Sequence, residues 1–76
     1  MNIEKFVKER NEAMFSLEKE KIVAYCKKYG IHIPENEQVF WAGVYKSILA
    51  VENSPEHLRH KAIEYLDGHG FKRTIS

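Results

Sequence analysis

The chain has a single cysteine, Cys26, and lacks any apolar run of about eighteen residues, the length that a membrane-spanning helix needs. One cysteine cannot form an intramolecular disulfide, and it excludes the zinc and redox motifs that use two cysteines. The apolar core of a signal peptide is also missing near residue 1, where the chain instead carries charges at Glu4, Lys5, Lys8 and Glu9. These absences predict a cytoplasmic protein that is not secreted and does not cross a membrane.

An excess of charge of one sign is missing as well. Twelve Lys and Arg stand against eleven Asp and Glu, which gives a formal charge of +1, and the two signs are not strongly segregated along the chain. Proteins that bind nucleic acid or membrane surfaces through electrostatics usually carry a basic excess. The composition therefore shows no signature of binding to a polyelectrolyte.

Glycine and proline are scarce, at four and two residues, and neither occurs between Asn2, the predicted N-cap of the first helix, and Tyr29. Hydrophobic residues make up 43% of the chain, which is enough for a small core and too much for a disordered segment. A chain of 76 residues supports one core. We predict a single all-α domain over 1–71, followed by a flexible tail over 72–76.

The apolar periodicity predicts a compact bundle of four short helices at about 3–14, 17–29, 36–52 and 55–67. We place the first break at Phe15–Ser16, because the apolar stripe that follows is rotated by roughly 100° from the stripe that precedes it. Ser16 is the predicted N-cap of a helix that begins at Leu17. Gly30 is the predicted left-handed residue that ends this helix, with Ile31 folding back onto it.

The third helix is predicted to be the central one, because the stretch 39–51 contains a single charged side chain, Lys46. Its large side chains form one broad arc, on which Trp41 is expected to be largely buried. A second arc carries small side chains, and it would let another helix approach closely: Gly43, Ser47 and Ala50.

The ends of the third and fourth helices carry recognisable signals. Asn36 is a predicted N-cap of the third helix. The sequence Ser54-Pro55-Glu56 is typical of a helix start, with serine as N-cap and proline in the first turn. The fourth helix is predicted to stop within 67–70, where Phe71 folds back as a hydrophobic stop.

Two constellations contain residue types that bind metals or act as nucleophiles. His57, His60 and Glu64 are spaced so that all three could reach one ion, but they lie opposite the apolar positions of their helix, on a solvated face. Cys26 and His32 would provide a thiol and a base, but Cys26 falls on an apolar stripe, which indicates a buried structural cysteine. Phosphate-loop, nucleophile-elbow and dinucleotide motifs are absent. We therefore expect no metal, no cofactor and no enzymatic activity.

By elimination, the sequence predicts a small intracellular protein-interaction domain, such as an adaptor, a regulator or an accessory subunit. The surplus of large apolar side chains on the third helix supports this prediction. We expect a protein partner, or a second copy in a homodimer, to contact Trp41, Tyr45, Leu49 and Phe71. The alternative is a nucleic-acid-binding regulator that uses the fourth helix and the basic tail, although acidic residues on the same helix surface disfavour it.

Overall fold

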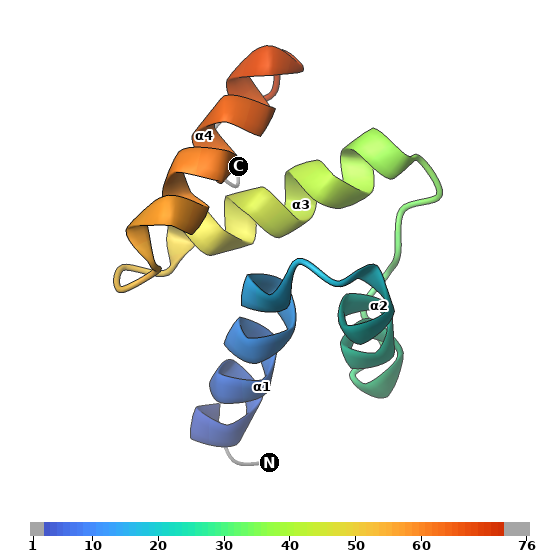
Figure 1. Ribbon diagram of the computed structural model, residues 1–76. Coiled ribbons are helices and arrows are strands. Elements are labelled where there is room, and N and C mark those ends of the chain that lie inside the picture. The colour runs from blue at the N-terminus through green and yellow to red at the C-terminus, as the bar shows by residue number, and fades with distance from the viewer. Residues whose placement is uncertain (1–2, 73–76) are drawn as a thin grey trace. The chain divides into compact units, whose positions relative to one another are not determined.

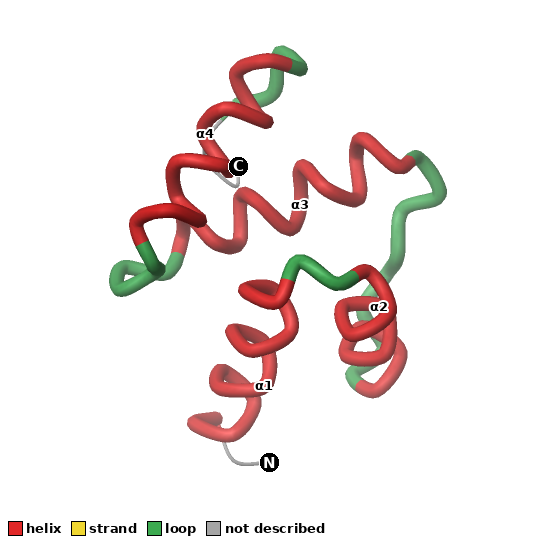
Figure 2. The backbone as a smooth tube through the Cα atoms, in the orientation of Figure 1, coloured by secondary structure: helices red, strands yellow, loops and turns green. Residues whose placement is uncertain are grey.

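Residues 3–72 are described in the computed structural model, and they form four α-helices and no strand (Figures 1 and 2). The helices are α1 (Ile3–Ser16), α2 (Lys19–Lys28), α3 (Glu37–Ala50) and α4 (Glu56–Gly68). The predicted all-α class is confirmed, and each helix end lies within two residues of its predicted position. None of the four described helices combines the length and the apolar character that crossing a bilayer requires.

The chain divides into two compact units, Met1–Ile33 and Pro34–Ser76. In the first unit α1 packs against α2, and in the second α3 packs against α4. It stays a prediction that residues 1–71 form one domain and that the third helix lies at its centre. Asn2, the predicted cap of the first helix, and residues 73–76 of the predicted tail lie outside the described residues.

An aromatic cluster holds the two helices of the first unit together. The Phe6 ring on α1 lies 5.9 Å from the Tyr25 ring on α2 and 4.8 Å from the Tyr29 ring just after α2, and the two tyrosine rings are 5.1 Å apart. Ile22 and Cys26 are buried on the same helix as Tyr25. Aromatic pairs of this geometry contribute about 0.5–1.5 kcal/mol each beyond the burial of their surface.

The break between α1 and α2 occurs at Leu17, whose φ of 54° lies in the left-handed region. The Ser16 hydroxyl donates to the Ala13 carbonyl at 2.6 Å and accepts from the Glu18 amide at 3.1 Å. The predicted break is confirmed, but Ser16 as N-cap of a helix beginning at Leu17 is wrong. A left-handed residue cannot continue a right-handed helix, so α2 begins at Lys19 and its N-cap is Glu18.

Glycines end α2 and α4 in the same way. Gly30 and Gly70 have φ values of 66° and 74°, a conformation that glycine adopts without strain. The amide of the next residue then reaches back to the helix: Ile31 N–H donates to the Cys26 carbonyl at 2.8 Å, and Phe71 N–H donates to the Leu66 carbonyl at 2.8 Å. These bonds define the Schellman motif. The predicted stops at Gly30 and Phe71 are confirmed.

The second unit is built from the apolar faces of α3 and α4. The Asn36 side chain accepts from the Val39 amide at 3.1 Å, which confirms the predicted cap at the start of α3. Buried side chains then come from both helices, with Phe40, Val44 and Ile48 on α3 and Leu58, Ala62 and Leu66 on α4. Their three- and four-residue spacing places them on one face of each helix.

Ser54 closes the end of α3 and does not cap α4. Its buried hydroxyl lies 2.5 Å from the Ile48 carbonyl oxygen and 2.8 Å from that of Val51, so its proton is shared between two acceptors. The Arg59 guanidinium also donates to the Val51 carbonyl, at 3.0 Å. Ser54 as N-cap is therefore wrong: α4 begins at Glu56, and Pro55 precedes it without a side-chain cap.

Within the second unit, the arc of small side chains on α3 is not the face that packs against α4. Gly43 and Ala50 are exposed, and a Cβ atom added to Gly43 would meet nothing within 4 Å. The Ser47 hydroxyl bonds to the Gly43 carbonyl of its own helix at 2.9 Å. Within the second unit α4 covers the face of the large side chains instead, and close packing of another helix on the small arc stays a prediction.

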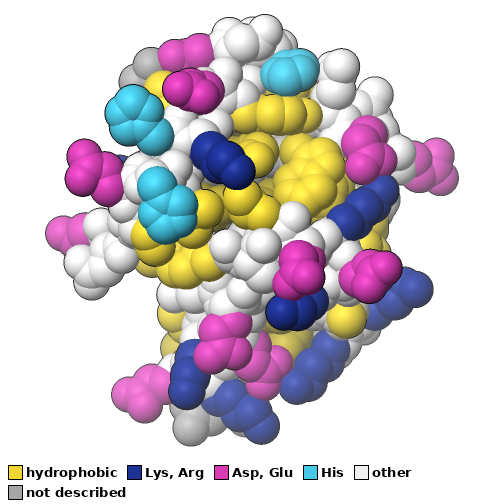
Figure 3. Space-filling model, in the orientation of Figure 1, with side chains coloured by type: hydrophobic (Ala, Val, Ile, Leu, Met, Phe, Trp, Pro, Cys, Tyr) yellow, Lys and Arg dark blue, Asp and Glu magenta, His cyan; other side chains and the backbone are white. Residues whose placement is uncertain are grey.

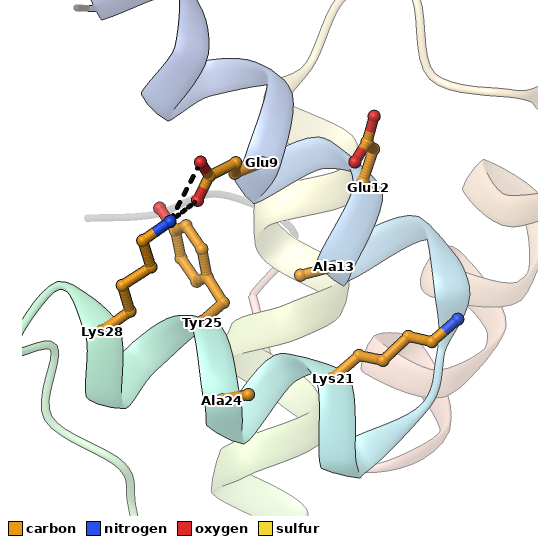
Figure 4. Close-up of a pocket in the computed structure, with 7 residues that line it drawn as sticks. All are labelled: Glu9, Glu12, Ala13, Lys21, Ala24, Tyr25 and Lys28. Carbon is orange, nitrogen blue, oxygen red and sulfur yellow. Dashed lines mark hydrogen bonds and ion pairs between the residues drawn. The ribbon is translucent and has the colours of Figure 1, made fainter.

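A charged cluster joins α1 to the end of α2. The two carboxylate oxygens of Glu9 lie 3.1 and 2.9 Å from Lys28 Nζ (Figure 4). The Tyr29 hydroxyl donates to the same carboxylate at 2.8 Å. The hydrogen bond from Lys28, followed by that from Tyr29, holds the pKa of Glu9 below its ordinary value. The hydrogen bond to Glu9 in turn raises the pKa of Lys28 and of Tyr29.

Substitutions of Ser54 should separate its observed role from an N-cap role. Ser54→Ala should lower the free energy of unfolding by about 1–2 kcal/mol, because a buried donor to two carbonyls is lost. Ser54→Asp should cost more, about 2 kcal/mol or above, because a buried carboxylate would face carbonyl oxygens. Chemical denaturation measures both values. An aspartate is a good N-cap, so a neutral Ser54→Asp would show that Ser54 caps α4 after all.

Replacing Glu9 should make stability less dependent on acid. Because the folded-state pKa of Glu9 is lowered, its contribution is present above its unfolded-state pKa and is lost as the pH falls through the folded-state value. Glu9→Gln should therefore lower the thermal midpoint at neutral pH, with a difference from wild type that disappears in acid. Midpoints measured across the acid range test this. A difference that stays constant with pH would exclude the ionised carboxylate as its source.

Candidate functional site

Four aromatic side chains of the second unit form a continuous line, which we call the aromatic row: Trp41, Tyr45, Tyr65 and His69. The rings of Trp41 and Tyr45 are 6.2 Å apart, and those of Tyr45 and Tyr65 are 5.0 Å apart. The Tyr65 and His69 rings are stacked at 4.2 Å. The buried Phe40 ring packs perpendicular to the Trp41 ring, and the two ring centroids are 5.1 Å apart.

Helix geometry explains why these four side chains meet. Trp41 and Tyr45 are four residues apart on α3, and Tyr65 and His69 are four residues apart at the end of α4, so each pair shares one helix face. Packing of α3 on α4 then brings Tyr45 against Tyr65. The row therefore exists only because two helices that are separated in sequence lie against each other.

Hydrogen bonds fix the polar ends of the row. Trp41 Nε1–H donates to the Glu37 carboxylate at 3.3 Å, one turn earlier on α3. The Tyr65 hydroxyl donates to the Gln38 carbonyl at 3.3 Å, and His69 Nδ1 lies 2.9 Å from the Tyr65 carbonyl oxygen. These hydrogen bonds restrict the orientations of the Trp41, Tyr65 and His69 rings.

The row is partly open to solvent. Trp41, Tyr45 and Tyr65 are half-buried and His69 is exposed. Burial raises the pKa of Tyr45, and the neighbouring Tyr65 adds to the shift. On the face seen in Figure 3, hydrophobic side chains gather over α3 and α4. Trp41 keeps part of its surface in contact with solvent, because its indole nitrogen reaches outward to an exposed glutamate, and this partial exposure does not contradict the expectation that Trp41 is largely buried.

The structure brings together only part of the predicted interaction surface. Trp41 and Tyr45 are neighbours, and Leu49 follows Tyr45 by one turn of α3 and is half-buried. Phe71 is half-buried after the end of α4, and none of the ring contacts within residues 3–72 joins Phe71 to Trp41 or Tyr45. That these four residues contact a partner stays a prediction.

Sequence reasoning missed Tyr65 and His69. The apolar periodicity of the fourth helix predicts that Tyr65 lies on its buried face, and His69 falls within the predicted stop over 67–70. The four-residue spacing of two flat rings was a signal that both lie on one face. Their position beside Tyr45 could not be read from sequence, because it depends on how α4 lies on α3.

The candidate metal ligands lie on α4, and the candidate thiol lies on α2. His60 Nδ1 and a Glu64 carboxylate oxygen are 4.0 Å apart, with 77% and 78% of their side chains exposed. Within residues 3–72, no three His, Cys, Asp or Glu side chains are placed to hold one ion. Cys26 is a buried free thiol, and burial raises its pKa, which opposes formation of the reactive thiolate.

Comparison of the chain with family models, with curated proteins and with solved structures finds no match. The functional assignment therefore depends on the chemistry of the chain's own residues.

The contact between Tyr45 and Tyr65 should be measurable as a coupling. In a double-mutant cycle of Tyr45→Leu and Tyr65→Leu, the two losses in free energy of unfolding should depart from additivity by about 0.5–1.5 kcal/mol. A matched cycle of Ile3→Ala and Tyr65→Leu should be additive, because Ile3 is 74% exposed and belongs to the other unit of the chain. Equal coupling in both cycles would mean that the ring contact is not its source.

Proposed function

We propose that the chain is a cytoplasmic, non-enzymatic protein-interaction domain that binds a protein partner through the aromatic row. The row presents half-buried rings on two packed helices, with Leu49 one turn beyond Tyr45 and Phe71 after the end of α4. The observation that carries the proposal is the unbroken series of ring contacts from Trp41 to His69, which leaves aromatic surface open to solvent.

Aromatic side chains dominate the energetics of many protein interfaces. Tryptophan and tyrosine are enriched among the few residues that contribute most of the binding free energy. A protein surface binds its partner more tightly when its rings are already ordered, because less conformational freedom is lost on binding. Mutual ring contacts and the bonds to Glu37 and Gln38 provide such ordering here. A second copy of the chain is one candidate partner for this surface, because the sequence predicts either a different protein or a homodimer.

The alternative function as a nucleic-acid binder gains no support from α4. The Arg59 guanidinium donates to the Val51 carbonyl and is therefore occupied within the fold. Exposed Glu56, Glu64 and Asp67 share the helix with the exposed Lys61. Acidic side chains of this number would repel phosphates from the same surface.

Partner capture with matched variants tests the proposal. Immobilised wild-type chain should retain a defined set of proteins from lysate at high salt, identified by mass spectrometry. Trp41→Ala and His69→Ala should reduce that retention by about tenfold or more, because each removes one end of the row. Val39→Ala is the control, since it removes an exposed apolar side chain of α3 outside the row and should leave retention unchanged.

Two results would contradict the proposal. One is retention that survives both row variants while their helix content matches wild type. The other is binding to heparin or DNA that disappears as salt rises, which is the behaviour of a nucleic-acid binder. His69 is exposed, so the His69→Ala variant reports on binding without a large change in folding.

A further inference from the structure

A groove of about 410 Å³ lies between the two helices of the first unit (Figure 4). Its floor contains two alanines, which hold no bulky side chain over the helix backbones. Its walls come from α1 and α2, and the lining residues are Glu9, Glu12, Ala13, Lys21, Ala24, Tyr25 and Lys28. Tyr25 is buried and forms the inner aromatic wall.

The charges of the groove are divided between the helices. Both acidic side chains, Glu9 and Glu12, belong to α1, and both basic side chains, Lys21 and Lys28, belong to α2. The lining is therefore neutral overall but carries one negative wall and one positive wall. A small ion of either sign would be attracted by one wall and repelled by the other.

The two ends of the groove differ in what they offer. At one end Glu9 is occupied by Lys28 and by Tyr29, so this pair is closed within the fold. At the other end Glu12 is exposed and makes no ion pair with any residue of 3–72. Lys21 is paired with Glu18 at 2.7 Å, but both side chains are more than half exposed, and such pairs contribute little and exchange readily.

A surface with one negative and one positive wall is complementary to itself under a two-fold rotation. In a two-fold interface residue i contacts residue j and residue j contacts residue i, so every charge pair occurs twice. Rotation of the groove about an axis between its walls places the α1 wall of one copy against the α2 wall of the other. This charge complementarity favours a second copy of the chain as the occupant of the groove.

We propose that the α1–α2 groove is a homodimer interface in which Glu12 of each copy pairs with Lys21 of the other. The alanine floor lets the helices of the two copies approach closely. The apolar surface continues over α2, where a neighbouring hollow of about 560 Å³ shares Ala24 and is also lined by Val23. This inference does not depend on the aromatic row, which belongs to the other unit of the chain.

Charge reversal in the full-length chain, followed by sedimentation equilibrium over a concentration series, tests the interface. Wild type should approach twice the monomer mass of 8.9 kDa as concentration rises. Glu12→Lys and Lys21→Glu should each raise the dimer dissociation constant by roughly tenfold or more, because each reverses two contacts per dimer. Added salt should weaken the wild-type dimer by screening the same contacts.

Restoring opposite charges distinguishes loss of the proposed ion pairs between Glu12 and Lys21 from loss of folding. An equimolar mixture of Glu12→Lys and Lys21→Glu should form a heterodimer of wild-type affinity, because both contacts then join opposite charges. The double variant Glu12→Lys with Lys21→Glu should recover the homodimer. Glu64→Lys and Lys61→Glu on α4 make the same changes in net charge outside the groove, and they should leave the dimer unchanged.

Three outcomes overturn the proposal. The first is a mass that stays at 8.9 kDa across the concentration series. The second is a dimer that survives both single reversals. If that dimer is lost in Trp41→Ala, self-association belongs to the aromatic row. The third is failure of the mixture and of the double variant to dimerise although circular dichroism shows wild-type helix content. None of these results bears on whether the aromatic row binds a different protein.

Discussion

Helices of 10 to 14 residues are marginal in water by themselves, so each helix of this chain depends on a neighbour that covers its apolar face. The chain meets this constraint in pairs, α1 with α2 and α3 with α4. Pairing requires a reversal of direction between the helices without unsatisfied backbone groups. Left-handed Leu17 provides the reversal in the first pair, and the bonds of Ser54 and Arg59 to the end of α3 provide it in the second.

The surfaces with functional interest follow from the same pairing. A pair of helices buries one face of each and leaves the flanks of the contact partly open. In the second pair the open flank carries the rings from Trp41 to His69. In the first pair it carries a groove with acidic residues on one helix and basic residues on the other. Aromatic contact and charge complementarity are both means of binding protein, and neither requires a catalytic group.

The errors of the sequence predictions share a physical cause. Ser16 and Ser54 were both interpreted as N-caps because serine before an acidic turn favours that role. In the structure both hydroxyls donate to carbonyls of the preceding helix, so each serine closes one helix and does not open the next. The local sequence allows either use of the hydroxyl. The direction of the neighbouring helix decides which carbonyls come within reach.

The sequence by itself determined the all-α class, the four helices, the left-handed stop at Gly30 and the end of α4 within 67–70, because hydrophobic periodicity, capping and positive φ act within a few residues. It also placed Trp41 and Tyr45 on one face of α3, since helical spacing alone requires it. Only the tertiary structure decided that Tyr65 and His69 extend that face, that Gly43 stays exposed, and that Glu12 and Lys21 stand on opposite walls of one groove. Those outcomes depend on how one helix lies against the next, and that is set by the sum of many side-chain contacts between the two helices of each pair.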